Sequence, residues 1–288
     1  MKIALIFLVI SITFIVINFV QLTEAIVGYY GEAKDAKIGD IPYIALIKVL
    51  HPHMGIFMPI CAGSIISKYD ILTNALCASA CQYPPHCKLY VGRVNVDDGG
   101  VEIQIESTVW HESYVEMDAI KTFTHTILDL GIIHTKGIPF SDNVTDIEMS
   151  NTPVGPVNNF VGYIFGWGAD TDKAFKEVPK HHPILKYGKV SYFSCKAPTD
   201  RFRGICTTIN DDFPEVQPAI SDMGAPIIDK SSGKDKLVGV GSYYHFRYEF
   251  APNKSTQFHS DSEQWLLYNK YFPVGENINW IKDNMSQH

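Results

Sequence analysis

Short runs of β-branched and aromatic residues, separated by turn-forming residues, limit what this chain can fold into. Five such runs stand out: 43–49, 64–66, 88–94, 101–105 and 236–243. Many short strands with Gly, Pro, Asn or Asp between them are typical of an all-β barrel or sandwich. Only residues 278–284 have convincing helical spacing, with Ile278, Trp280 and Ile281 on one face. The sequence therefore predicts an all-β fold with a C-terminal α-helix.

The N-terminal segment has the layout of a cleaved secretory signal peptide. Lys2 precedes an apolar run at 3–20, and Thr23-Glu24-Ala25 then offers small residues at the spacing that signal peptidase needs. The alternative is a single membrane anchor, because the run approaches the roughly 18 residues that can span a bilayer. Three polar interruptions in the run favour the signal peptide. We therefore expect a leader at 1–25, a mature domain at 26–288, and a secreted, extracellular protein with no membrane contact after cleavage.

The positions of the cysteines and sequons predict disulfide bonds and glycosylation sites. The chain has 6 cysteines, and cysteines in an oxidising compartment should pair, although counting leaves the connectivity open. Three Asn-x-Ser/Thr sequons are candidate glycosylation sites: Asn143, Asn253 and Asn284.

The overall composition excludes two classes of protein. A hydrophobic content of 46% excludes disorder, because it is enough to form a buried core. The 31 acidic residues outnumber the 24 basic ones, and no Lys/Arg block stands out. We therefore expect no nucleic-acid partner, since such binding depends on a basic surface.

Eight short strings follow one another along residues 26–281. They are IVG from 26, CAGSII from 61, LTNALC from 72, LDLGII from 128, GWG from 166, SDMGAP from 221, SYY from 242 and NWI from 279. Together they resemble the trypsin/chymotrypsin-like serine protease family, over essentially the whole mature chain. The resemblance implies two six-stranded antiparallel β-barrels packed face to face. It also implies the disulfides Cys61–Cys77 and Cys195–Cys206, which leaves Cys81 and Cys87 to close a small local loop.

The same resemblance locates the catalytic triad, and there the chain departs from the family. A serine protease needs a hydroxyl nucleophile, an imidazole base and a carboxylate that orients the imidazole. Leu76 occupies the base position and Met223 the nucleophile position, so neither side chain can transfer a proton. Only Asp129, the carboxylate, remains. Other histidines lie on other segments, and none precedes Cys77, the cysteine that ends the LTNALC string: His51, His53, His86 and His111.

The oxyanion hole and the substrate pocket also differ from the family pattern. Ser221 replaces the glycine two residues before the nucleophile position, where a Cβ disfavours the strained loop conformation. Gln217 stands where trypsin-like members carry an acid at the base of the pocket. Ser242 and Tyr243 keep the family's spacing, and Tyr244 replaces the glycine at the pocket entrance. A tyrosine ring there would obstruct a substrate side chain, unless it swings outward.

Two further expectations follow from the resemblance. Ile26 should be the mature N-terminus, and its ammonium is expected to pair with the Asp222 carboxylate as a buried N-terminal lock. No metal and no cofactor is expected. The acids near the family's calcium loop have unconvincing spacing, and the adjacent pair His181-His182 lacks a third ligand.

The combined pattern resembles the inactivated serine protease paralogues of parasitic mites, which are related to the mite group 3 allergens. That resemblance implies a pseudoprotease that acts by binding proteins, with host complement or related plasma defence proteins as partners. An arthropod immune-regulatory serine protease homologue is one alternative. A decoy for protease inhibitors is another, although it needs an open cleft, against which Tyr244 argues. A residual hydrolase would have to work without the usual base and nucleophile.

Overall fold

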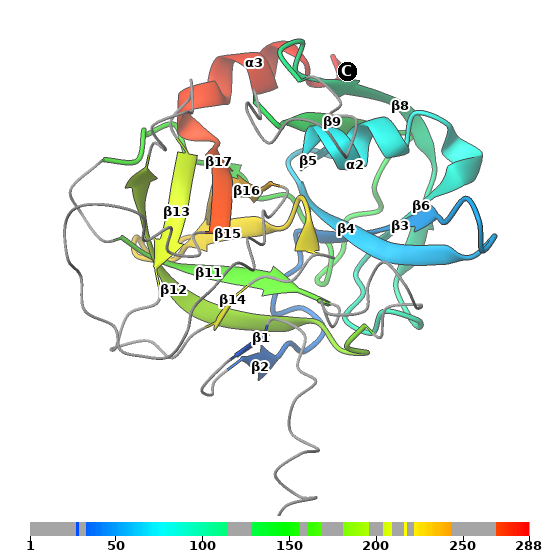
Figure 1. The fold of residues 1–288 in the computed structure, drawn as a ribbon, viewed down its shortest axis with the longest axis horizontal. Helices are drawn as coiled ribbons and strands as arrows, with labels where there is room; N and C mark the ends of the chain where they lie inside the picture. The colour runs from blue at the N-terminus through cyan, green and yellow to red at the C-terminus, as the bar shows by residue number, and fades with distance from the viewer. Residues whose placement is uncertain are drawn as a thin grey trace, which may run out of the picture.

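The computed structural model describes residues 27–28, 33–114, 128–155, 160–168, 181–195, 204–208, 216–217, 222–242 and 269–287 (Figure 1). Its elements in chain order are β1 (Val27–Gly28), β2 (Lys34–Asp35), β3 (Ile44–Leu50), β4 (Phe57–Ile65), β5 (Asp70–Thr73), α2 (Ala75–Ala80), η1 (Pro84–His86), β6 (Cys87–Val91), β7 (Val101–Ile103), β8 (Ile105–Trp110), β9 (Gly131–Thr135), β10 (Glu148–Met149), β11 (Phe160–Gly166), β12 (Lys186–Cys195), β13 (Gly204–Thr208), β14 (Val216–Gln217), β15 (Pro226–Asp229), β16 (Lys236–Gly241), β17 (Asn269–Pro273), η4 (Gly275–Asn277) and α3 (Ile278–Asp283).

The N-terminal half of the fold is a curled antiparallel sheet. Its seven strands run in the order β7-β6-β3-β4-β5-β9-β8. The outermost strands, β7 and β8, are consecutive in the chain and only Gln104 separates them. Because one of them pairs with β6 and the other with β9, the sheet curls back on itself as a barrel does.

The C-terminal half is a closed barrel. Strands β15, β11, β12, β13, β17 and β16 each pair with the next, and an additional β15–β16 pairing completes the circle. The short strand β10 joins β16 in parallel, and β2 joins β12. The predicted antiparallel two-barrel fold with a C-terminal helix is confirmed, and four predicted strand runs match β3, β6, β7 and β16 to within a few residues, whereas the run 64–66 coincides only with the end of β4.

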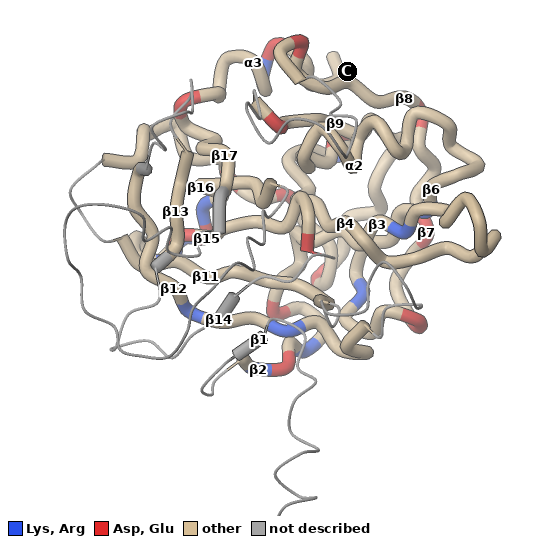
Figure 2. The backbone as a smooth tube through the Cα atoms, in the orientation of Figure 1, with Lys and Arg blue, Asp and Glu red and all other residues tan. Residues whose placement is uncertain are grey.

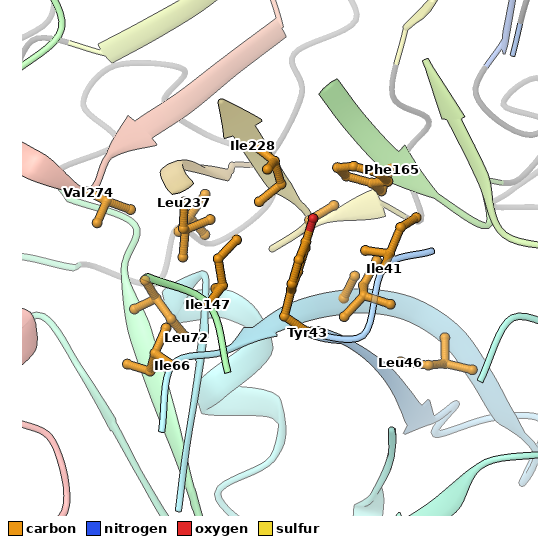
Figure 3. Close-up of a cluster of buried hydrophobic side chains, with 14 of the residues drawn as sticks. Ile41, Tyr43, Leu46, Ile66, Leu72, Ile147, Phe165, Ile228, Leu237 and Val274 are labelled. Carbon is orange, nitrogen blue, oxygen red and sulfur yellow. The ribbon is translucent and has the colours of Figure 1, made fainter. Parts of the chain in front are cut away.

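A shared hydrophobic cluster joins the two barrels (Figure 3). Leu46 and Leu72 of the first barrel and Phe165, Ile228 and Leu237 of the second are all buried in it. Figure 3 shows Leu72, Ile228 and Leu237 around Ile147, with Leu46 apart from them in this view. At its edge the Tyr43 hydroxyl donates to Asp235 Oδ2 at 2.6 Å. The functional positions lie beside this contact between the barrels, so their geometry depends on both halves of the chain.

Helix α2 is the main difference from the sequence-based expectation of a single convincing helix. It has only six residues, and its N-cap Asn74 accepts a hydrogen bond from the Cys77 N–H through Oδ1 at 2.9 Å. Such a short, alanine-rich helix has too few apolar positions to give a periodic signal. An N-cap residue of this type satisfies one of the free backbone donors of the first turn.

A polar cluster, here called the C-terminal clasp, ties residue 286 to the first barrel. Its members are Asp70, His134, Ser67 and Ser286. The Asp70 carboxylate, which is buried, accepts from Ser67 Oγ at 2.6 Å and from Ser286 Oγ at 2.7 Å, and lies 2.8 Å from His134 Nδ1. Ser286 also donates its N–H to Asp70. Burial alone would raise the pKa of Asp70, but the hydrogen bonds from His134, Ser67 and Ser286 hold it below its usual value.

The clasp predicts an acid-sensitive contribution to stability. Since the folded-state pKa of Asp70 is lowered, its ionised form stabilises the fold above the unfolded-state value of about 3.9, and this contribution is lost as the pH falls through the lower value. We expect Asp70→Asn to reduce the free energy of unfolding by about 1–2 kcal/mol at neutral pH, with a shrinking difference below about pH 4. Urea titrations of both proteins between neutral and acidic pH measure this. Asp146→Asn, at an exposed position, is the control. If the free energies of unfolding of D70N and the unchanged protein differed by the same amount at every pH, the stabilising role of the ionised Asp70 would be contradicted.

Candidate functional site

The carboxylate of Asp129 is the centre of the candidate site. It is almost fully buried, with 1% of the residue exposed. Its Oδ1 accepts from the backbone N–H of Ala75 at 2.8 Å and of Leu76 at 3.3 Å, at the start of α2. Its Oδ2 accepts from Ser242 Oγ at 2.8 Å and from Asn74 Nδ2 at 3.2 Å. All four donors are neutral, and in the described part of the chain no histidine donates to this carboxylate.

These contacts give Asp129 a structural role. Burial raises its pKa, and the hydrogen bonds from Ser242, Leu76, Ala75 and Asn74 offset this only in part. Asp129 lies two residues before Gly131, the first residue of β9. Its hydrogen bonds therefore connect the first turn of α2 to the start of β9. It therefore holds in place the helix that carries the base position.

Leu76 and Met223, which the sequence predicts at the base and nucleophile positions, pack in or against one hydrophobic cluster. Met223 is 6% exposed and belongs to the interior cluster of the first barrel, together with Cys61 and Cys77. Leu76 is half-buried and packs against the same cluster. In an active member these two positions hold a polar pair that exchanges a proton. Here both side chains add to the apolar core.

The backbone around Met223 is fixed to the first barrel. The Met223 carbonyl oxygen accepts from the Ala62 N–H at 2.7 Å, and Cys61 and Met223 form an isolated parallel bridge. Next to it, Gly224 has a φ of 78°, a conformation that a residue with a Cβ rarely adopts. A Cβ there would also collide with Thr73 Oγ1 and the Ala62 carbonyl oxygen. The Gly224-Ala225-Pro226 part of the motif is therefore explained by close packing between the barrels.

Asp222 is buried against the GWG string at 166–168. Its Oδ1 accepts from the Gly168 N–H at 2.8 Å, and the residue is 1% exposed. Strand β1 pairs with β14, with Val27 opposite Gln217. This pairing places Val27, the residue after Ile26, beside the segment that precedes Met223. Ile26 itself lies outside the described residues, so the N-terminal lock to Asp222 stays a prediction.

Two polar side chains have roles that the sequence did not reveal. Ser242 was expected only as a pocket position, but it is buried and donates to Asp129. Asn74 was not singled out at all, yet it both caps α2 and donates to Asp129. An Asn immediately before a short Ala/Ser-rich segment is an N-cap signal that could have identified it.

The other predicted pocket positions are only partly described. Gln217 has a described backbone, in β14, but its side chain is outside the described set. Ser221, Tyr243 and Tyr244 lie outside the described residues altogether, so whether Tyr244 obstructs the pocket stays a prediction.

Disulfide pairing follows the expectation where the structure describes it. Cys61 pairs with Cys77, and Cys81 pairs with Cys87. Cys206 is also disulfide-bonded, and β12 and β13, which carry Cys195 and Cys206, are neighbours. The side chain of Cys195 lies outside the described set. The Cys61–Cys77 disulfide also contacts the nucleophile position, since Cys77 Sγ lies 3.7 Å from the Met223 carbonyl oxygen.

The sequons differ in their surroundings. Asn143 is exposed, within the tight turn closed by Ser141 and Val144. Asn284 is half-buried at the end of α3, and its Nδ2 donates to the Trp280 carbonyl oxygen at 2.8 Å. Asn253 lies outside the described residues. Of the two sequons that the structure describes, Asn143 is the more accessible.

Neither metal ligation nor a membrane span is visible in the described segments. They contain no group of three or more His, Cys, Asp or Glu residues suited to hold a metal ion. None of their helices has both the length and the apolar character needed to cross a bilayer. His181 has a buried ring whose pKa is lowered to about 4, mainly by burial, and it lies in no such group.

Comparisons with known proteins agree with this geometry. The family model described as Trypsin matches residues 31–258. Venom serine protease Bi-VSP of Bombus ignitus is 32% identical over 149 residues, which cover 47% of this chain and 38% of that protein. The clotting factor G beta subunit of Tachypleus tridentatus is 26% identical over 231 residues, covering 70% of this chain and 67% of that protein. The first match thus spans well under half of its relative.

Proposed function

Because the chain belongs to the trypsin family of serine proteases, we propose that it is a secreted, catalytically inactive member that acts by binding another protein. The observation that carries this proposal is that Met223 is buried in one hydrophobic cluster and that the half-buried Leu76 packs against the same cluster. Hydrolysis by this family needs a base and a nucleophile at those positions. An alkyl group and a thioether provide neither.

The hydrogen bonds of Asp129 support the same conclusion. Its described partners are the two backbone N–H groups, the Asn74 amide and the Ser242 hydroxyl. Two described histidines are engaged elsewhere. The His111 ring packs at a tilt against Trp280 with ring centroids 5.1 Å apart, and His134 belongs to the C-terminal clasp. A substitute base would have to leave these contacts.

A serine-directed reagent tests the loss of catalysis. We expect the secreted protein to remain unlabelled by a fluorophosphonate probe that labels active trypsin-family proteases, and to hydrolyse no member of a peptide-substrate panel above the buffer rate. Labelling is followed by mass spectrometry of the intact protein, with an active family member as the positive control. A labelled serine, or turnover that grows with protein concentration, would show that a catalytic site survives.

The partners that we propose are host complement or related plasma defence proteins. This part rests on the resemblance to inactivated mite paralogues, and an arthropod immune-regulatory role or capture of protease inhibitors are the alternatives. Affinity capture from host plasma, combined with a complement lysis assay, separates them. Enrichment of complement proteins together with reduced lysis supports complement proteins as the partners. Unchanged lysis with no captured serum protein contradicts a complement role.

A further inference from the structure

Two exposed apolar side chains lie on the loops beside the sequon of Asn143. Large hydrophobic side chains are exposed at six positions in the described part of the chain, and two of these are Ile38 (52% exposed) and Phe140 (45%). Phe140 precedes Asn143 by three residues. Ile38 lies in the loop between β2 and β3. We call residues 37–40 and 140–145 the sequon surface.

The turn that carries Asn143 is firmly anchored. Ser141 and Val144 exchange backbone hydrogen bonds of 2.9 and 3.1 Å, so Asn143 lies at the tip of a two-residue turn. Val144 is buried in the first-barrel cluster, whereas Asn143 is exposed. Phe140 and Thr145 are the next residues on the two arms of the turn. Neighbours across such arms lie about 5–8 Å apart, which is within reach of an aromatic ring.

The second loop fits closely against the same turn. Gly39 has a φ of 86°, and a Cβ on it would lie 2.9 Å from Asn143 Oδ1. The Asn143 side chain therefore lies against bare backbone, next to Ile38. The Thr145 N–H donates to the Pro42 carbonyl oxygen at 3.0 Å, which ties the two loops together. A group attached to Asn143 thus begins between exposed apolar side chains of both loops.

Charges of both signs border the sequon surface. Figure 2 shows acidic and basic residues side by side at β2, which leads into the first loop. The exposed charged residues of the two loops and of β2 are Lys34, Asp35, Lys37, Asp40, Asp142 and Asp146. Interspersed charges of opposite sign do not build a strong field toward a charged partner. An uncharged occupant with an apolar face is compatible with this border.

We propose that Asn143 carries an N-linked glycan whose first sugar packs over the Phe140 ring, with Ile38 beside it. The sequon requires a lipid-pyrophosphate-linked oligosaccharide as the donor. The Asn143 amide nitrogen forms a bond to the anomeric carbon of the sugar, the bond from that carbon to the pyrophosphate oxygen breaks, and the amide loses one proton. The inference rests on secretion, which is part of the proposed function, and it is independent of the loss of catalysis.

The physical basis is contact between sugar C–H groups and an aromatic face. An N-acetylglucosamine ring presents C–H groups on one side, and the face of the Phe140 ring carries negative potential that attracts them. Covering Phe140 and Ile38 also removes exposed apolar area from water. Because the turn is already anchored by Val144, little further ordering is needed when the sugar packs. The glycan should therefore stabilise the fold.

The test measures occupancy and stability separately. The chain from residue 26 is expressed in mammalian cells that attach high-mannose glycans, behind a leader of known function, and a parallel expression with residues 1–25 tests secretion by itself. Peptide mass spectrometry gives the occupancy of Asn143. Thermal unfolding is compared for the unchanged protein, Phe140→Ser, Asn143→Gln and the double variant. An endoglycosidase that leaves only the first sugar then separates its effect from that of the outer sugars.

We expect Asn143 to be occupied, and N143Q to lower the unfolding midpoint by about 2 °C or more. The effect of N143Q should be much smaller in the F140S background, since the two changes remove the same contact. Trimming to the first sugar should leave the midpoint unchanged. Tyr83→Ser, at another exposed apolar side chain, is the control and should preserve the full effect of N143Q.

Three results would overturn the inference. They are an unmodified Asn143 in the exported protein, an equal effect of N143Q with and without Phe140, and stabilisation that is lost when the outer sugars are trimmed. A dimer of the glycosylated protein that F140S dissociates also overturns it, because a second copy would then cover the ring. If residues 1–25 fail to direct secretion, the proposed function is contradicted, whereas the protein exported by the other leader still decides the glycan site.

Discussion

Replacing Asp129 by alanine is expected to destabilise the protein by about 3–5 kcal/mol, because its buried carboxylate accepts four hydrogen bonds. The change leaves four buried donors without an acceptor: the N–H groups of Ala75 and Leu76, the Asn74 amide and the Ser242 hydroxyl. Each unsatisfied buried donor costs roughly 1–3 kcal/mol. Burial of the Asp129 carboxylate is itself unfavourable, as its raised pKa indicates. Removing the carboxylate therefore offsets part of the loss in stability, which sets the lower end of the expected range.

The loss for Asp129→Asn should be smaller. The amide oxygen can still accept from Ala75 and Leu76, and the Ser242 hydroxyl can rotate to accept from the new amide, so that the main conflict is with Asn74. Urea denaturation of the disulfide-intact protein gives the free energies. Asp142→Ala, at an exposed position, is the matched control and should change stability by less than about 0.5 kcal/mol. A loss for D129A no larger than for D142A would refute the structural role of this carboxylate.

The second large effect is expected at Gly166. A Cβ at this position would overlap the Asp222 carboxylate, which is buried and accepts from the Gly168 N–H. The carboxylate cannot retreat without breaking that hydrogen bond and leaving a buried charge less well paired. We expect Gly166→Ala to cost more than about 4 kcal/mol, enough to abolish secretion of folded protein.

Gly155→Ala is the control variant for Gly166→Ala. A Cβ on Gly155 meets no atom within 4 Å, so its secreted yield and unfolding midpoint should match those of the unchanged protein. Both variants are measured by yield from the same expression host and by thermal unfolding. If G166A were secreted at the normal level and unfolded at the normal temperature, the close packing of Asp222 against β11 would be wrong.

The two-barrel fold was predictable because it rests on strings that follow one another in a fixed order along the chain. GWG and SDMGAP needed no structure to be recognised, and the structure adds the physical reasons for Gly166 and Gly224. The strand runs were also visible, since they are rich in β-branched and aromatic residues and turn-forming residues separate them.

Other parts of the site could not be read from the sequence for identifiable reasons. Helix α2 has six residues, which is too few for a helical period to stand out. The clasp joins Asp70 to His134 and to Ser286 across 64 and 216 residues, and no local motif marks such a contact. Ser242 lies 113 residues from Asp129, so its hydrogen bond follows from barrel packing and not from spacing.

The surroundings of Met223 would make the inactive state that we propose difficult to reverse in evolution. A hydroxyl returned to position 223 alone would enter the apolar first-barrel cluster without a base beside it and would carry the cost of an unsatisfied buried group. A histidine returned to the half-buried position 76 alone would face a thioether, which has no proton to give. Neither single step restores hydrolysis, so selection on such a chain would act on its surface while its interior stays apolar.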